Sequence, residues 1–119
     1  MGAAVVLVDV ARVERILGRH RVRFLGRVFS PEEREACAGA RNESERLAAR
    51  LAAKLAARRV LPEQFLPLRC VSVRGGAGDA PVLAIDPPPP GKAFVSLAHD
   101  GGVAAAAVVL EPDPKGSQP

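Results

Sequence analysis

The most regular hydrophobic pattern in this chain lies between Asn42 and Val60. Leucines recur there every four residues with alanines beside them, which is the apolar stripe of an amphipathic helix. The apolar stripe consists of Leu47, Leu51 and Leu55, with Ala48 and Ala52 beside them. The neighbouring stripe is basic and consists of Arg46, Arg50, Lys54 and Arg58. We predict a long central helix, capped by Asn42 and Glu45, that presents positive charge at the edge of its packing.

The segments before this helix predict a strand and two shorter helices. Residues 3–8 are short, apolar and rich in Val, which predicts a buried strand that ends at Asp9. An apolar row of Val13, Ile16 and Leu17 predicts a helix after Asp9. Ser30 precedes Pro31 and lies three residues before Glu33, so a capping box should start a helix that runs to about residue 39.

The second half of the chain has the short apolar runs of a β-sheet. Strands are predicted over residues 68–74, 81–85, 94–97 and 103–110. Residues 75–79 are rich in Gly and predict a turn, and the proline run of residues 86–91 predicts an extended surface linker. The expected fold is therefore α+β, with a small antiparallel sheet packed against the long central helix. We expect one domain over residues 1–111 and a flexible tail over residues 112–119.

Two polar features admit both a structural and a functional interpretation. A carboxylate at the end of a buried strand is costly unless it finds a partner, so Asp9 either caps the next helix or binds a metal ion. A second basic stripe consists of Arg12, Arg15, Arg19 and Arg23. It is either solvated or meets an acidic helix of a partner.

Composition narrows the classes of function. The chain has 119 residues and a formal net charge of +4, which favours an acidic partner or phosphates. It contains four Phe but no Trp or Tyr, and none stands among the basic stripes to stack on bases, so we expect no nucleic-acid partner. Cys37 and Cys70 lack metal-ligand spacing, which favours free thiols in the cytoplasm. No apolar run reaches the roughly 18 residues of a membrane helix, so we expect no membrane partner.

Four sequence segments, taken in order, resemble the bacterial holo-acyl-carrier-protein synthases, the AcpS-type phosphopantetheinyl transferases. They are VLVDVARVERI at residues 6–16, FSPEE at 29–33 with a Cys four residues on, LAARLAAKLA at 47–56 and VSLAHD at 95–100. The resemblance covers about Val5 to Leu110. It implies the AcpS-like fold, a homotrimer with active sites between subunits, and Mg²⁺-dependent transfer of 4'-phosphopantetheine from coenzyme A to a serine of an acyl carrier protein.

The resemblance also implies site residues. The strand-end aspartate that binds the metal falls on Asp9. The Arg and Lys of the central helix, which help to hold coenzyme A, fall on Arg50 and Lys54. The Ser and His of the late motif fall on Ser96 and His99. The basic helix that meets the carrier protein falls on the segment with Arg12 and Arg15.

These residue types suit phosphoryl transfer, which needs neutralised phosphate charge and a proton acceptor for the incoming hydroxyl. Asp9, Lys54 and His99 are therefore the expected catalytic residues. Arg50, Lys54, Ser96 and His99 are expected to bind coenzyme A. His99, beside a Gly-Gly turn, also fits a structural hydrogen-bonding role.

The sequence departs from the family at the site. The second metal ligand of the family is a Glu directly after the Lys, and here that position is Leu55. The late motif has Ala98 where a second Ser is usual, and the central helix has Leu51 where an aromatic residue is common. The proline run replaces a helix between the third and fourth strands. Two hypotheses therefore stand: a magnesium-dependent transferase that works without the second carboxylate, or a catalytically degenerate relative that binds a carrier protein or assembles with other subunits.

Overall fold

The computed structural model describes residues 2–62, 66–75 and 80–112 of the chain. Within them the elements follow in a simple order. They are β1 (Gly2–Asp9), α1 (Val10–Val28), α2 (Pro31–Cys37), α3 (Glu43–Val60), a 3₁₀ turn (Leu68–Cys70), β2 (Val71–Arg74), β3 (Val82–Ile85), β4 (Lys92–Asp100) and β5 (Val103–Glu111). The expected α+β architecture is confirmed.

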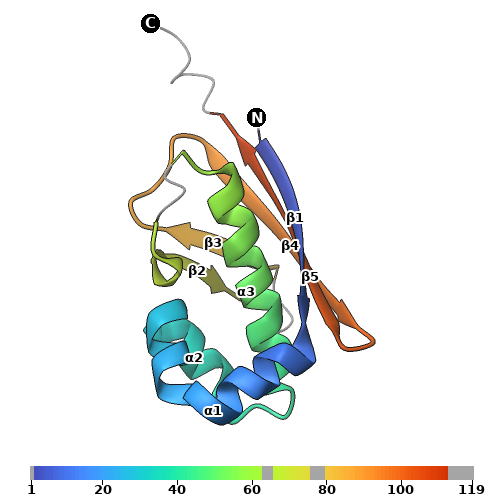
Figure 1. The fold of residues 1–119 in the computed structure, drawn as a ribbon. Helices are drawn as coiled ribbons and strands as arrows, with labels where there is room; N and C mark the ends of the chain where they lie inside the picture. Colours follow the sequence, from blue (N-terminus) through green and yellow to red (C-terminus); the bar gives the residue numbers. More distant parts are fainter. Residues whose placement is uncertain (1, 63–65, 76–79, 113–119) are drawn as a thin grey trace, which may run out of the picture.

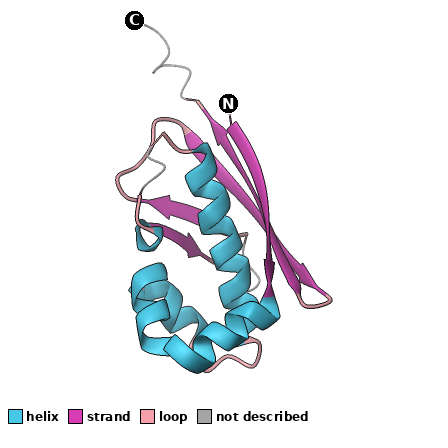
Figure 2. Cartoon of the chain, viewed as in Figure 1, coloured by secondary structure: helices cyan, strands magenta, loops and turns pink. Residues whose placement is uncertain are grey.

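The helix α3 lies in the middle of the molecule, between two antiparallel sheets (Figure 1). On one side is a three-stranded sheet with the order β1-β5-β4, and on the other is the β2-β3 hairpin. The helices α1 and α2 lie together near the N-terminal end of α3 (Figure 2). The core forms where α3 meets both sheets, through residues such as Val6, Val71 and Ala106.

Small side chains allow α3 to be enclosed on most sides. Its fully buried alanines are Ala48, Ala49, Ala52, Ala53, Ala56 and Ala57. Alanine lets neighbouring backbones come close while retaining full helix propensity. One consequence contradicts the sequence prediction: Arg50 is 6% exposed and Lys54 is 0% exposed, so the middle of the basic stripe lies in the interior.

The three-stranded sheet has one buried face and one exposed face. Val6, Ala104, Ala106 and Val108 are buried against the helices, as the period-two alternation of a strand requires. The opposite face is apolar but exposed: Val5 is 65% exposed, Leu7 67% and Phe94 52%. The prediction that residues 3–8 form a buried strand is therefore correct for one face of β1 and wrong for the other.

Two of the predicted helix caps differ in outcome. The capping box of α2 is confirmed, because the Glu33 amide donates to Ser30 Oγ at 3.2 Å and the Ser30 amide donates to Glu33 Oε1 at 3.0 Å. The predicted cap of α3 is wrong. Asn42 makes no side-chain cap, because its Oδ1 accepts a hydrogen bond from Arg46 Nε at 2.9 Å. Glu45 is thereby left free of the capping box.

The strand predicted over residues 68–74 is shorter in the structure. Residues 68–70 form the 3₁₀ turn instead, and β2 begins at Val71. The cause is the long-range packing of this turn against α1 and α3, which local alternation does not encode. Most of the predicted glycine turn and tail, residues 76–79 and 113–119, lie outside the described residues.

Candidate functional site

Asp9 lies where β1 gives way to α1. Its Oδ1 accepts a hydrogen bond from the Ala11 amide at 3.1 Å, so the helix-capping interpretation is confirmed. The side chain is exposed, and its second carboxylate oxygen remains available to another ligand. The Val10 amide donates to the Gly102 carbonyl at 2.9 Å, which fastens this corner to the turn between β4 and β5.

The sheet register brings His99 to the same end as Asp9. Val8, the neighbour of Asp9, pairs with Ala104, which pairs in turn with His99. Adjacent strands are about 4.8 Å apart, so His99 lies about 10 Å from Val8 across the sheet. His99 Nδ1 is 2.9 Å from Oε2 of Glu45, in the first turn of α3, and both side chains are 44% exposed.

Lys54 lies on a different side of α3, inside a buried polar network. Its Nζ forms an ion pair with Glu33 Oε1 and donates to the Leu68 and Val71 carbonyls. The other Glu33 oxygen accepts from the Val73 amide at 2.9 Å. Burial lowers the pKa of Lys54 below its ordinary value, and the Glu33 carboxylate opposes that shift. The three ammonium hydrogens thus have acceptors within the protein.

Arg50 is one helical turn before Lys54 and faces the end of β2. Its guanidinium donates to the Gly75 carbonyl at 3.2 Å, and its buried Nε has no partner among the described residues. Residues 76–79, which follow Gly75, lie outside the described part of the chain.

The other predicted site residues, Ser96, Arg12 and Arg15, lie on the surface of the chain, with Ser96 on β4 and both arginines on α1. Ser96 is exposed and three residues before His99 on β4, so the two side chains point to opposite faces of the sheet. Arg12 and Arg15 are exposed on α1. Asp9 and His99 lie at the same end of the sheet but on opposite faces, because Asp9 pairs with the exposed Val103 and His99 with the buried Ala104. Arg50, Lys54 and Ser96 lie elsewhere within the chain.

Of the predicted site residues, Asp9 is the one assigned to a metal ion. Leu55 is half-buried and packs against the core cluster that contains Val6 and Ala106. Among residues 2–62, 66–75 and 80–112, no group of three or more His, Cys, Asp or Glu side chains could hold a metal. Mg²⁺ is commonly held by one or two carboxylates together with substrate phosphates, so Asp9 meets the minimum requirement.

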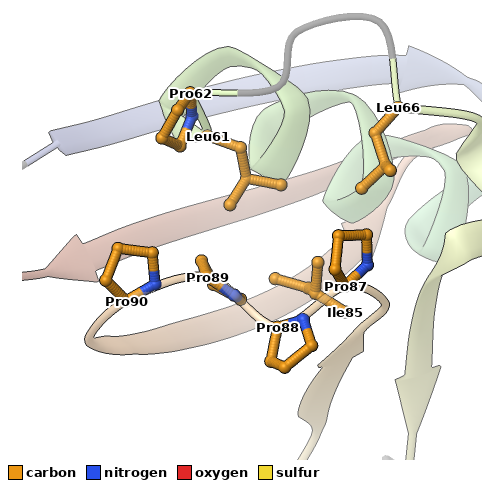
Figure 3. A pocket seen from close by; sticks show the side chains of 8 residues that line it. All are labelled: Leu61, Pro62, Leu66, Ile85, Pro87, Pro88, Pro89 and Pro90. Carbon is orange, nitrogen blue, oxygen red and sulfur yellow. The ribbon is translucent and has the colours of Figure 1, made fainter.

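An apolar pocket of about 220 Å³ lies at the other end of α3 (Figure 3). It is lined by Leu61, Pro62, Leu66, Ile85 and the proline run of residues 87–90. An 18-residue helix is about 27 Å long, so nearly the whole of α3 separates this pocket from His99. Its lining has no ionisable group that could take part in transfer chemistry.

Sequence reasoning missed Glu33 and Glu45 as partners of the site residues. From the sequence Glu33 was identified only as part of a capping box. Its buried ion pair with Lys54, 21 positions away, cannot be inferred from local sequence patterns. Glu45 was assigned to the capping box, and its pairing with His99 depends on how α3 lies on the sheet.

Comparison with known proteins identifies the class to which this α+β fold and site belong. No model of a protein family matches the chain. The chain is 42% identical to a holo-[acyl-carrier-protein] synthase of Anaeromyxobacter dehalogenans, over 93% of this chain and 95% of that protein. It is 40% identical to the enzyme of that name from Thermus thermophilus, over 92% of both.

A solved structure agrees. The holo-[acyl-carrier-protein] synthase (AcpS) of Helicobacter pylori, in complex with coenzyme A, superimposes with a TM-score of 0.81 at 25% identity. The match covers 92% of this chain and 100% of that one. The chain belongs to the holo-acyl-carrier-protein synthase family. Among the described residues, no helix is long and apolar enough to cross a membrane.

Proposed function

We propose that this protein transfers 4'-phosphopantetheine from coenzyme A to a serine of an acyl carrier protein. The observation that carries the proposal is the 42% identity, over 93% of the chain, with a relative named for this activity. The helix-start aspartate and the histidine at the end of β4 lie at the same end of the sheet, on opposite faces of it.

In the proposed reaction the serine oxygen attacks the phosphorus that carries pantetheine. The pyrophosphate P–O bond breaks, 3',5'-ADP leaves, and the serine proton passes to a base. We assign the proton acceptor to His99. Arg50 and Ser96 bind the phosphates or nucleotide of coenzyme A. Lys54 acts by holding α2, α3 and β2 in place through Glu33, because its ammonium group is enclosed.

Asp9 is the residue that would hold Mg²⁺. When bound, the ion would neutralise phosphate charge as the P–O bond breaks. Leu55 cannot bind an ion, so coenzyme A phosphates and water would supply the remaining ligands.

We further propose a homotrimer in the cytoplasm. The exposed apolar face of the three-stranded sheet supports assembly, since monomeric proteins rarely expose large contiguous apolar patches. Residues placed apart in one chain, such as Ser96 and Arg50, would then serve sites shared between copies. Both cysteines are free, which agrees with a reducing compartment.

The carrier protein would bind along α1. Arg12 and Arg15 are exposed there, one position before and two after the buried Val13. An exposed cationic row suits an acidic partner and speeds association.

The test is incubation of the protein with coenzyme A, Mg²⁺ and an apo carrier protein, followed by mass spectrometry of the carrier. We expect the carrier to gain phosphopantetheine. Asp9→Asn should abolish most of the transfer while preserving the fold, because Asn is as good a helix cap as Asp. The proposal is wrong if no carrier protein gains the group, including one from the same genome.

A second candidate function is a catalytically degenerate subunit that binds a carrier protein. Leu55 favours it, because an apolar side chain occupies the position of the family's second carboxylate ligand. In that case coenzyme A and Mg²⁺ together would leave the melting temperature unchanged, whereas a ligand of the folded state must raise it.

A further inference from the structure

Glu45 has the one charged contact to His99 in the described part of the chain. We propose that Glu45 is a positioning residue that acts on the transfer reaction through His99. Its carboxylate accepts the Nδ1 proton of the imidazole and leaves Nε2 as the nitrogen that meets the carrier serine. The inference rests on the proposed function, because the orientation of this ring matters only if His99 takes the serine proton.

The contact joins two well-anchored elements. Glu45 is in the first turn of α3, two residues after Glu43, which is held by both terminal nitrogens of Arg21 at 2.8 and 2.7 Å. The buried Leu47 fixes the following turn in the core. His99 is paired through the sheet with the buried Ala104. A distance of 2.9 Å between Oε2 and Nδ1 therefore reflects the docking of α3 on the sheet.

The Glu45 carboxylate has no other evident role in helix capping or in stability. The capping box that its spacing suggested does not form, because Asn42 bonds Arg46 instead. The interaction of the first turn with the helix dipole is shared by Glu43. An ion pair in which both side chains are 44% exposed contributes little to stability.

The contact with Glu45 determines which ring nitrogen of His99 carries the proton. A neutral ring carries a proton on one nitrogen and a lone pair on the other. A carboxylate at Nδ1 selects the tautomer in which Nε2 is free to accept a proton, and it also fixes the plane of the ring. Glu45 would therefore supply both the tautomer and the orientation that a proton acceptor needs.

The first test is nitrogen-15 NMR of the ring nitrogens at alkaline pH. The chain has two histidines, so His20→Gln leaves His99 as the one source of ring signals. We expect the Nδ1-protonated form in this background. Adding Glu45→Ala should shift the population toward the Nε2-protonated form that free imidazole side chains favour. Adding Glu35→Ala, which removes the same charge from an exposed residue with no ion pair among the described residues, should not. Identical tautomers with and without Glu45 would overturn the proposal.

The second test is a double-mutant cycle on kcat/KM for transfer. Loss of the partner that orients a metal-ligating histidine typically costs about 10–100-fold, and we expect a loss of this size for Glu45→Ala. Glu45→Gln, which keeps an acceptor oxygen, should recover most of it. In a His99→Ala background, Glu45→Ala should cost nothing more, because both residues act as one unit.

Failure of the proposed function and failure of the Glu45 proposal give different results. A wild-type protein that transfers nothing overturns the proposed function, and the catalytic role of Glu45 with it. An active wild type in which Glu45→Ala and His99→Ala multiply their losses overturns the role of Glu45 alone.

Discussion

A buried lysine is tolerated only where neighbouring groups pair with its charge and accept its hydrogen bonds. Lys54 is 0% exposed, and its ammonium group meets one carboxylate and two carbonyl oxygens. It also lies 5.3 Å from the centre of the Phe29 ring. The arrangement ties the middle of α3 to the start of α2 and to β2. Burying these charges is costly, so the network contributes more to fixing the relative positions of α2, α3 and β2 than to net stability.

Lys54→Met should therefore destabilise the protein severely. It leaves the Glu33 carboxylate buried without its cation, which typically costs about 3–5 kcal/mol of the free energy of unfolding. Urea denaturation measures the loss. Adding Glu33→Gln should recover part of it, because the unpaired charge disappears while the acceptor oxygen can remain.

The matched control is Arg59→Met, in the last turn of the same helix, where the side chain is exposed. Its effect should stay within about 0.5 kcal/mol. A Lys54→Met variant that is as stable as the control would show that the buried ion pair is dispensable.

Leu55 allows a direct test of the missing carboxylate. Leu55→Glu should destabilise the unliganded protein by about 1–2 kcal/mol, because a half-buried apolar side chain is lost. It should also add a ligand for Mg²⁺. The rise in melting temperature on adding Mg²⁺ with coenzyme A should exceed that of the wild type, as thermal scans would show.

Leu55→Gln is the appropriate comparison, since it removes the same apolar group without adding a negative charge. Equal responses of the Glu and Gln variants to Mg²⁺ would mean that position 55 does not face the metal.

At the scale of elements, the docking of α1 against α3 includes a paired charge that pH can titrate. Arg21 and Glu43 form a two-pronged ion pair. The hydrogen bond from Arg21 holds the pKa of Glu43 below its ordinary value of 4.5. A carboxylate whose pKa is depressed by folding stabilises the folded state above the unfolded pKa, and that contribution is lost as pH falls through the folded pKa.

Arg21→Met should consequently be less stable than the wild type at neutral pH by about 0.5–1 kcal/mol, because Arg21 is nearly half exposed and water screens the pair. The difference should be complete above about pH 5 and shrink as the pH falls below 4.5. Urea midpoints at several pH values measure it. Arg19→Met, an exposed neighbour with no ion pair among the described residues, should show no such trend. A pH-independent difference for Arg21→Met would exclude the ion pair as its cause.

Local sequence signals predicted the elements well where the controlling interaction is itself local. The capping box of α2 formed as expected, and the cap at Asp9 is one of the two interpretations that the sequence left open; both involve residues two or three positions apart. The apolar run of residues 3–8 predicted a buried strand, but β1 buries one face only, and Val5 and Leu7 on the other face are 65% and 67% exposed.

Predictions failed where a distant partner decides the outcome. Arg50 and Lys54 were expected at an exposed edge, but Glu33, 21 residues before Lys54, and the carbonyls of the 3₁₀ turn and β2 permit burial. The same turn shortened the predicted strand. The Glu45–His99 contact joins residues more than fifty positions apart, so periodicity could not reveal it. His99 was marked only by the family resemblance, whereas Asp9 was also a candidate because it is a carboxylate at the end of an apolar strand.

At the scale of the whole molecule, the exposed apolar face of the three-stranded sheet remains to be explained. Val5 and Leu7 on β1 share this face with Phe94 on β4, and Val103, 42% exposed, lies at its end beside Asp9. Such a face in water is typical of a surface that another molecule covers. If further copies of the chain cover it, the proposed site at Asp9 would border the interface.

Val5→Glu tests this interface near the centre of β1. Because Val5 is 65% exposed in one chain, the substitution should barely change the stability of a monomer, but it would bury a charge in an assembled interface. We expect sedimentation equilibrium to show a trimer for the wild type and a monomer for Val5→Glu, with transfer activity falling together with assembly. Val82→Glu, a comparably exposed valine on the β2-β3 hairpin, should leave both the trimer and the activity intact. Unchanged assembly of Val5→Glu would refute an interface at this face, and a monomer that keeps full activity would refute a site shared between copies.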